Sequence, residues 1–167
     1  MTSYQIEGPW PGRLAIIPRP RGGEWLEGEA LTWKAQGFDV VVSLLTKDEI
    51  AEFDLAREAD LVRAQGMLFS ELQIPDLGVP ESLAAARDFV GKLHDALEHG
   101  KRIAIHCRQG IGRSGLIAVG VLIVSGFEPE LAMREVSTAR RLPVPETPEQ
   151  REWLQELARE SATSLVK

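Results

Sequence analysis

One stretch of the chain constrains the fold more than any other, because it joins two apolar runs through a glycine-rich turn. Residues 102–105 read RIAI, residues 106–115 read HCRQGIGRSG, and residues 116–124 read LIAVGVLIV. The first run predicts a buried strand, and the turn and second run predict entry into a buried helix. Strands that lead directly into helices are typical of α/β sheets, whose ligands bind beyond the carboxyl ends of the strands.

The rest of the chain shows the same alternation. Strands are also predicted at residues 14–17, 39–45 and 67–73. Helices are predicted at residues 25–36, 47–65, 80–98, 113–125, 129–140 and 148–161. The unbroken apolar run at 39–45 is typical of a strand buried on both faces of a parallel sheet. We therefore expect a single α/β domain over residues 1–167, with a mostly parallel central sheet of about four strands flanked by helices.

Charge and hydropathy exclude several kinds of partner. The chain carries 19 Lys and Arg against 25 Asp and Glu, a net charge of -6, so we expect no nucleic-acid partner. The longest apolar run, residues 116–124, is too short to cross a bilayer, and we expect no membrane partner. The first residues, MTSYQIEGPWPGR, lack the basic and apolar segments of a secretory signal. A cytoplasmic protein is the resulting expectation.

The chain has one cysteine, Cys107. A single cysteine excludes an intramolecular disulfide and any zinc site built from several thiolates. Cys107 is therefore either an inert thiol in the core or a reactive one.

Two motifs overlap around this cysteine. From Gly110 the sequence reads G-x-G-x-x-G, which occurs in dinucleotide-binding turns, and from Cys107 it reads C-x5-R. A dinucleotide site needs the turn directly after the strand and a second strand after the helix. Here three residues intervene, and another helix is predicted after residue 125. A Walker loop is excluded because its lysine is absent.

The cysteine motif fits this context better. A loop between a strand and a helix N-terminus directs successive backbone N–H groups toward one point, and the helix dipole adds positive charge there. Gly110 and Gly112 allow such a turn, and a cysteine at this place is favoured as a thiolate. Arg113 offers a planar guanidinium that can bind two oxygens of a phosphoryl group.

The pattern H-C-x-x-G-x-x-R-S-G resembles the active-site signature of the cysteine-dependent protein tyrosine phosphatase superfamily. Its fixed positions are matched by His106, Cys107, Gly110, Arg113, Ser114 and Gly115. The resemblance implies a phosphate-binding loop formed by Arg108, Gln109, Gly110, Ile111, Gly112 and Arg113. It implies further that Cys107 is the nucleophile, that Ser114 donates to its sulfur, and that His106 orients the loop and favours the thiolate. It implies no metal and no organic cofactor.

A general acid is needed as well, because an alkoxide is a poor leaving group. Residues 74–80 read IPDLGVP and by themselves predict an ordinary turn before a helix. The stretch also resembles the acid loop of the family, W-P-D-x-G-x-P, with Ile74 in place of tryptophan. On that basis Asp76 is expected to be the acid.

Two roles are open for Gln150. Thr147, Pro148 and Gln150 have the spacing of a helix capping box. The same spacing, T-x-x-Q-x-x-aromatic, resembles the glutamine loop of the family, whose glutamine positions the attacking water. The two roles compete for one side chain.

The resemblance covers residues 14–153 and points to the small dual-specificity-like branch. The expected function is hydrolysis of phosphotyrosine, and of phosphoserine or phosphothreonine, in proteins through a phosphocysteine intermediate. Phosphate and vanadate-like oxyanions are expected to bind the loop. The alternatives are a phosphoinositide or other small-molecule phosphatase, a rhodanese-like sulfurtransferase and a phosphate-binding module without turnover. Arg19 and Arg21 could reach an acidic substrate, but a solvated loop is the expectation for them and for residues 47–49.

Overall fold

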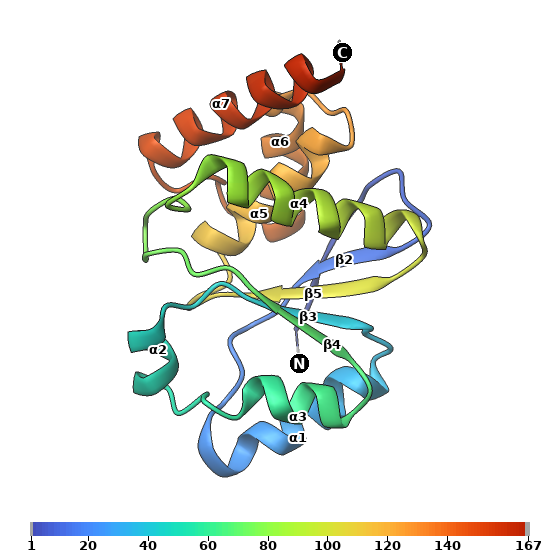
Figure 1. The fold of residues 1–167 in the computed structure, drawn as a ribbon, viewed down its shortest axis with the longest axis vertical. Helices are drawn as coiled ribbons and strands as arrows, with labels where there is room; N and C mark the ends of the chain where they lie inside the picture. Colours follow the sequence, from blue (N-terminus) through green and yellow to red (C-terminus); the bar gives the residue numbers. More distant parts are fainter. Residues whose placement is uncertain (1, 166–167) are drawn as a thin grey trace.

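The structure is a computed structural model that describes residues 2–165. Its centre is a five-stranded sheet with the order β1-β2-β5-β3-β4 (Figure 1). The strands are β1 Tyr4–Ile6, β2 Arg13–Ile16, β3 Val40–Ser43, β4 Leu68–Glu71 and β5 Arg102–His106. β1 pairs antiparallel with β2, and the other neighbours are parallel. The predicted fold class, a mostly parallel sheet flanked by helices, is confirmed.

Helices cover both faces of this sheet. They are η1 Gly23–Trp25, α1 Leu26–Ala35, α2 Lys47–Glu52, α3 Glu58–Ala64, α4 Leu83–Glu98, α5 Gly112–Val124, α6 Pro129–Arg140 and α7 Pro148–Leu165. In Figure 1, α4, α5, α6 and α7 lie on one face and α1 and α3 on the other, whereas α2 lies beyond one end of the strands. The helices after the cysteine loop therefore make up most of one layer.

The alternation of side chains along β2 shows how the two layers form. Leu14 and Ile16 pack into the core beneath α4, α5 and α7, and Ala15 and Ile17 pack into a smaller core with Trp33 of α1. Each residue of α5 from Gly112 to Ile123 is buried, as expected for a helix that is apolar on all sides. The helix that follows the cysteine loop is thus held firmly inside the domain.

Parallel pairing brings three strand ends to one edge of the sheet. Ser43 is in register with His106 on one side and with Glu71 on the other. The loops after β3, β4 and β5 therefore meet at that edge, close to α2 (Figure 1).

The structure differs from the sequence prediction at two places. β1 was not predicted, because it has only three residues and gains its partner by pairing at the sheet edge with β2. The predicted helix over 47–65 is two helices, α2 and α3. The chain breaks at Asp54, whose φ is 55°, and the turn lets Leu55 enter a cluster with Leu26 and Leu45.

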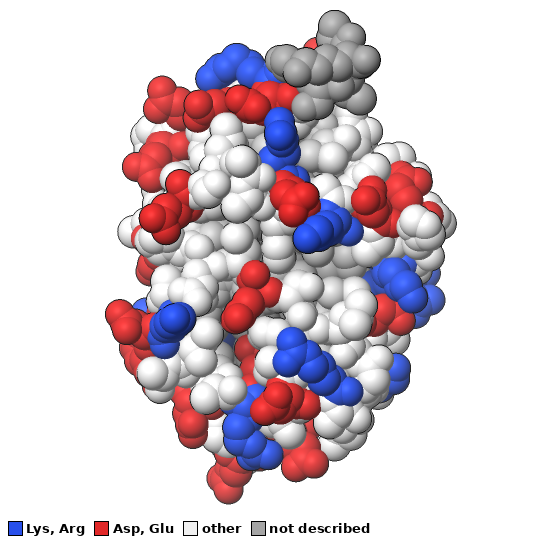
Figure 2. Space-filling model, viewed as in Figure 1, with Lys and Arg blue, Asp and Glu red and all other residues white. Residues whose placement is uncertain are grey.

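On the face shown in Figure 2, charged side chains are distributed rather than gathered into one basic patch. Figure 2 shows Lys and Arg interspersed with Asp and Glu over the visible face, and acidic side chains gathered along α7. None of the helices within residues 2–165 is both long and apolar enough to span a membrane.

Candidate active site

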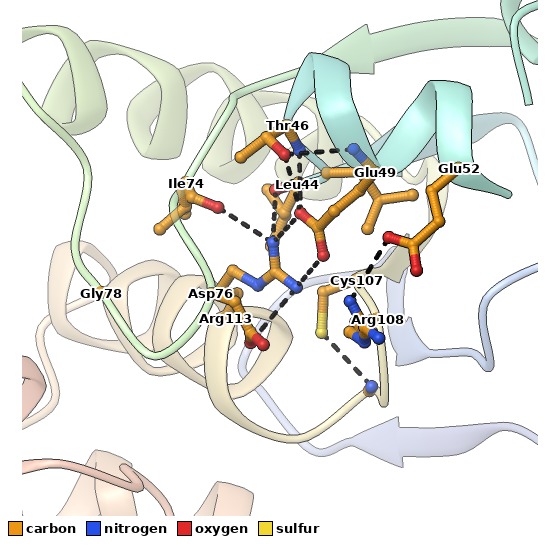
Figure 3. Close-up of polar contacts among 12 residues, drawn as sticks. Leu44, Thr46, Glu49, Glu52, Ile74, Asp76, Gly78, Cys107, Arg108 and Arg113 are labelled. Atoms are coloured by element: carbon orange, nitrogen blue, oxygen red, sulfur yellow. Dashed lines mark hydrogen bonds and ion pairs between the residues drawn. The ribbon is translucent and has the colours of Figure 1, made fainter.

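The cysteine loop connects β5 to α5. Cys107 follows the end of the strand and is only 2% exposed, and the backbone N–H of Gly110 donates to its Sγ at 3.2 Å (Figure 3). Gly110 has a φ of +72°, so its backbone takes a conformation that a side chain would strain. Its carbonyl accepts from Nε of the buried Arg140 at 2.7 Å. The loop is thus fixed from behind by a residue of α6.

The same loop has free backbone donors. Within residues 2–165, the N–H groups of Arg108, Gln109 and Ile111 donate to no protein acceptor. α5 begins at Gly112, so the positive end of its dipole also lies at the loop. An anion placed next to Cys107 would find unpaired N–H groups and the start of a helix.

Arg113 lies beneath this loop and is 1% exposed. Its two terminal nitrogens donate to the two oxygens of Glu49, with Nη1–Oε1 at 2.6 Å and Nη2–Oε2 at 2.8 Å. Nη1 also donates to the carbonyl of Ile74 at 2.9 Å. These bonds fix the plane of the guanidinium in a single orientation (Figure 3).

Glu49 pairs with the arginine of the candidate site, whereas its sequence context indicated a solvated loop, and this expectation was wrong. The side chain is buried, and it completes a capping box in which Thr46 Oγ1 accepts from the Glu49 N–H and Glu49 Oε1 accepts from the Thr46 N–H. The T-x-x-E pattern at residues 46–49, directly after a buried strand, was the signal that could have revealed it.

This pair shifts the ionisation of both partners. Burial by itself would raise the pKa of Glu49, but hydrogen bonds from Arg113 and Thr46 outweigh it and lower the pKa from 4.5 to about 2. Burial would lower the pKa of Arg113, but the hydrogen bond to Glu49 and the charges of Cys107, Glu49 and Asp76 raise it. The pair is therefore ionised at neutral pH.

The loop after β4 brings Asp76 to the same place. Asp76 Oδ1 lies 3.4 Å from Nη2 of Arg113, and the Asp76 side chain is 54% exposed (Figure 3). The residue at the tryptophan position of the family pattern, Ile74, is buried in the core and accepts from Arg113. Leu77 follows with a φ of 63° and is exposed. One end of this loop is therefore anchored to the arginine beneath the cysteine loop.

Cys107, Arg113 and Asp76 line one cavity of about 270 Å³. Its other lining residues are Leu77, Gln109, Gly112 and Glu146. Glu146 was not predicted from the sequence; its carboxylate lies against Gly112, where an added Cβ would be 2.7 Å from Oε2. A larger cavity of about 540 Å³ lies beside α6, but the three predicted residues lie outside it.

His106 is held by a carboxylate that the sequence analysis missed. Its Nε2 lies 2.5 Å from Oε1 of Glu58, both side chains are buried, and the ring stacks on Trp33 with 6.2 Å between centroids. Among the described residues Nδ1 has no hydrogen-bond partner. In the tautomer with its proton on Nε2, that N–H donates to Glu58 and Nδ1 carries no hydrogen, so each ring donor has an acceptor. No local pattern identifies Glu58, because it lies 48 residues from its partner.

Ser114 differs from expectation in its hydrogen bonding. Its Oγ is buried and has no partner within residues 2–165, so the expected bond to the sulfur of Cys107 is not formed here. The sulfur accepts from Gly110 instead. The role of Ser114 toward the sulfur stays a prediction.

Gln150 joins the acid loop to the start of α7. Nε2 donates to the carbonyl of Gly78 at 3.0 Å, and Oε1 accepts from the N–H of Glu146 at 3.1 Å. Thr147 Oγ1 accepts from the N–H of Gln150 at 3.1 Å, which is one half of the predicted capping box. In a complete capping box, the Gln150 side chain would also accept from the N–H of Thr147. Here its Oε1 accepts from the N–H of Glu146 instead. The water-positioning role of Gln150 stays a prediction.

Residues 2–165 contain no group of three or more His, Cys, Asp or Glu side chains arranged to hold a metal ion. The arrangement of the cavity is that of a site for an oxyanion beside a nucleophile.

Comparison with known proteins relates the chain to phosphatases. The family model described as "Polymorphic toxin system, DSP-PTPase phosphatase" matches residues 27–127. Cyclin-dependent kinase inhibitor 3 from Rattus norvegicus is 26% identical over 125 residues, which are 74% of this chain and 58% of the relative. The Homo sapiens protein of the same name is 25% identical over 134 residues, 79% of this chain and 63% of the relative. The chain thus spans little more than half the length of these relatives.

Solved structures show the same fold. Kinase associated phosphatase, with a substitution of its catalytic-site cysteine to a serine, superposes with a TM-score of 0.82 at 22% identity, covering 90% of this chain and 88% of that one. Tk-PTP in the active form has a TM-score of 0.75 at 30% identity, covering 94% and 96%. The family match extends over more than half of the chain and includes Cys107, Arg113 and Asp76. The chain belongs to the family of dual-specificity-type protein tyrosine phosphatases.

Proposed function

We propose that this chain hydrolyses phosphomonoesters with Cys107 as the nucleophile and Asp76 as the general acid. The observation that carries the proposal is the single cavity shared by Cys107, Arg113 and Asp76. The loop that carries Cys107 has unpaired N–H groups and leads into α5, and the ionised Arg113 lines the same cavity. This is the preorganised positive field that phosphoryl transfer needs.

In the first step the sulfur of Cys107 forms a bond to phosphorus, and the bond from phosphorus to the ester oxygen breaks. Asp76 gives its proton to that leaving oxygen. Arg113 and the loop N–H groups hold the other phosphoryl oxygens while charge redistributes over them. Glu49 keeps the guanidinium in plane, because its bidentate pairing leaves little rotational freedom.

In the second step water attacks the phosphocysteine. The Asp76 carboxylate accepts a proton from the water, the sulfur–phosphorus bond breaks, and inorganic phosphate leaves. Gln150 connects Gly78 of the acid loop to Glu146, which lines the cavity. The same contacts would let Gln150 hold the acid loop near the attacking water.

Phosphotyrosine in proteins is the proposed substrate, with phosphoserine and phosphothreonine as further substrates. Two of the residues that line the cavity, Asp76 and Leu77, are exposed, which supports a substrate group that reaches the site from a protein surface. No metal or organic cofactor has a step in this chemistry.

The test is hydrolysis of p-nitrophenyl phosphate and phosphotyrosine peptides by the wild type and by Cys107→Ser. We expect the serine variant to lose at least about four orders of magnitude in kcat, because the nucleophile acts as part of a unit. It should still bind vanadate, because the loop donors remain. Asp76→Asn serves as the second arm and should lose about 10²- to 10⁴-fold. Turnover by Cys107→Ser close to wild type would falsify the nucleophile assignment.

A further inference from the structure

Two arginine side chains lie against the ring of Phe53, beside the cysteine loop. Cζ of Arg19 is 3.5 Å from the ring centroid, and Cζ of Arg108 is 5.1 Å from it. Arg19 comes from the loop after β2, Phe53 ends α2, and Arg108 directly follows Cys107. Three distant segments therefore bring two positive charges together at the rim of the site.

The positive charge at this place is only partly balanced. Oε2 of Glu52 lies 3.7 Å from Nη1 of Arg108, but both side chains are well exposed, so the pair is weak (Figure 3). Within residues 2–165, Arg19 has no carboxylate at ion-pair distance, and its buried Nε has no hydrogen-bond partner. A buried donor without an acceptor is unfavourable. Among the described residues, Arg19 therefore has no anionic partner, and Arg108 has only the exposed Glu52.

The backbone around Arg19 is fixed on both sides. Gly22 lies so close to the turn after α2 that an added Cβ would be 1.9 Å from the carbonyl oxygen of Phe53. Gly23 donates to the carbonyl of Asp54 at 3.0 Å. The carbonyl of Ile17 lies in contact with Gly110 of the cysteine loop, 3.4 Å from where its Cβ would be. Arg19 is therefore presented by a loop docked on the cysteine loop and on the Phe53 turn.

Arg21, in the same loop, provides the contrast. Its guanidinium pairs with Glu29 at 2.9 Å, lies over the ring of Trp25, and is 64% exposed. Arg21 is therefore a solvated surface residue, as the sequence predicts. Arg19 is half-buried and unpaired, so the same expectation was wrong for it.

We propose that Arg19 and Arg108, stacked on Phe53, form a second anion-binding subsite for an acidic or phosphorylated residue next to the phosphorylated residue of a peptide substrate. The proposal rests on the proposed function, because the first phosphoryl group must occupy the Cys107 loop. Guanidinium groups stacked on a ring keep their donor edges free to bind a carboxylate or phosphate. A peptide is favoured over an anionic lipid surface, since such a surface needs a cluster of basic side chains, and Figure 2 shows Lys and Arg interspersed with Asp and Glu on the visible face.

The experiment compares two phosphotyrosine peptides that differ only in flanking residues, one set neutral and one acidic. For the wild type at low salt we expect KM for the acidic peptide to be about tenfold lower, as for a charge-assisted hydrogen bond. Added salt should reduce this advantage, because the subsite is at the surface. Arg19→Gln should remove most of the advantage. Arg21→Gln is the matched control and should keep it.

Three results would overturn the subsite. The first is an equal KM of the wild type for the two peptides. The second is an equal change of the KM advantage in Arg19→Gln and Arg21→Gln. The third is a lower KM for a short-chain phosphatidylinositol phosphate than for either peptide. If no phosphomonoester is hydrolysed in a Cys107-dependent manner, the proposed function fails instead. In that case, calorimetry measures the affinities of both peptides for Cys107→Ser and tests the subsite separately. Equal affinities would refute the subsite.

Discussion

Two buried carboxylates from the segment after β3 support the cysteine loop, and they do so in different ways. Glu49 of α2 pairs with Arg113, which lines the cavity, whereas Glu58 of α3 pairs with His106, which lies within the core. Both pairs are short and nearly inaccessible to water. They differ in what lies on the far side of Arg113 and of His106.

Arg113 has one side toward Glu49 and another toward the cavity and Asp76. Its orientation therefore affects any anion that binds next to Cys107. His106 is enclosed by Glu58 and the ring of Trp33, and it reaches the cavity only through the backbone that it shares with Cys107. Equal burial therefore does not imply an equal role, because Arg113 lines the cavity and His106 does not.

Of the changes to these two pairs, loss of the Glu49–Arg113 ion pair should have the largest effect on catalytic activity. Glu49→Gln should lower kcat/KM by about 10²- to 10³-fold, the cost typical of losing one oriented oxyanion donor, because Arg113 loses its ionic partner and its fixed plane. Steady-state kinetics on p-nitrophenyl phosphate measures this. Asp48→Asn is the control, since Asp48 is the exposed neighbour in the same helix, and it should stay within about twofold. Similar losses in both variants would contradict a specific role for Glu49.

The next effect concerns acid stability. The pKa of Glu49 is about 2 in the folded protein and 4.5 as its ordinary value, so its ionisation stabilises the fold above about pH 4.5 and this contribution is lost as pH falls toward 2. The difference corresponds to roughly 3 kcal/mol in the free energy of unfolding. Urea unfolding of wild type and Glu49→Gln between pH 6 and 2.5 checks it. The wild type should lose more stability over this range than the variant, and parallel curves would contradict the assignment.

The sequence predicted those parts of the site that follow from local spacing. The strand, glycine turn and apolar helix around Cys107 are contiguous, and the structure has them as β5, the loop and α5. Residues 74–80 by themselves predict only a turn, and Asp76 was expected at the site because this stretch resembles the acid loop of the family. The structure brings Asp76 and Cys107 to one cavity.

The supporting residues could not be predicted in this way. Glu49 and Arg113 are 64 residues apart, Glu58 and His106 are 48 apart, and Arg140 reaches Gly110 over 30 residues. A carboxylate in an acidic helical segment is indistinguishable by pattern from its solvated neighbours until the tertiary fold buries it. The break at Asp54 has the same origin, since burial of Leu55 overrides the helical pattern of residues 47–65.

The smallest expected effect is that of Glu58→Gln. The amide oxygen can still accept from Nε2 of His106, so the change removes the carboxyl group and keeps the hydrogen bond. We expect a loss of about 1 kcal/mol in the free energy of unfolding and a decrease in kcat of about threefold, because the ring stays stacked on Trp33 and still places the end of β5. Urea unfolding and steady-state kinetics at neutral pH measure the two effects on one preparation. A decrease in kcat as large as that of Glu49→Gln, without a larger loss of stability, would mean that the charge of Glu58 acts on the sulfur itself rather than on the placement of the loop.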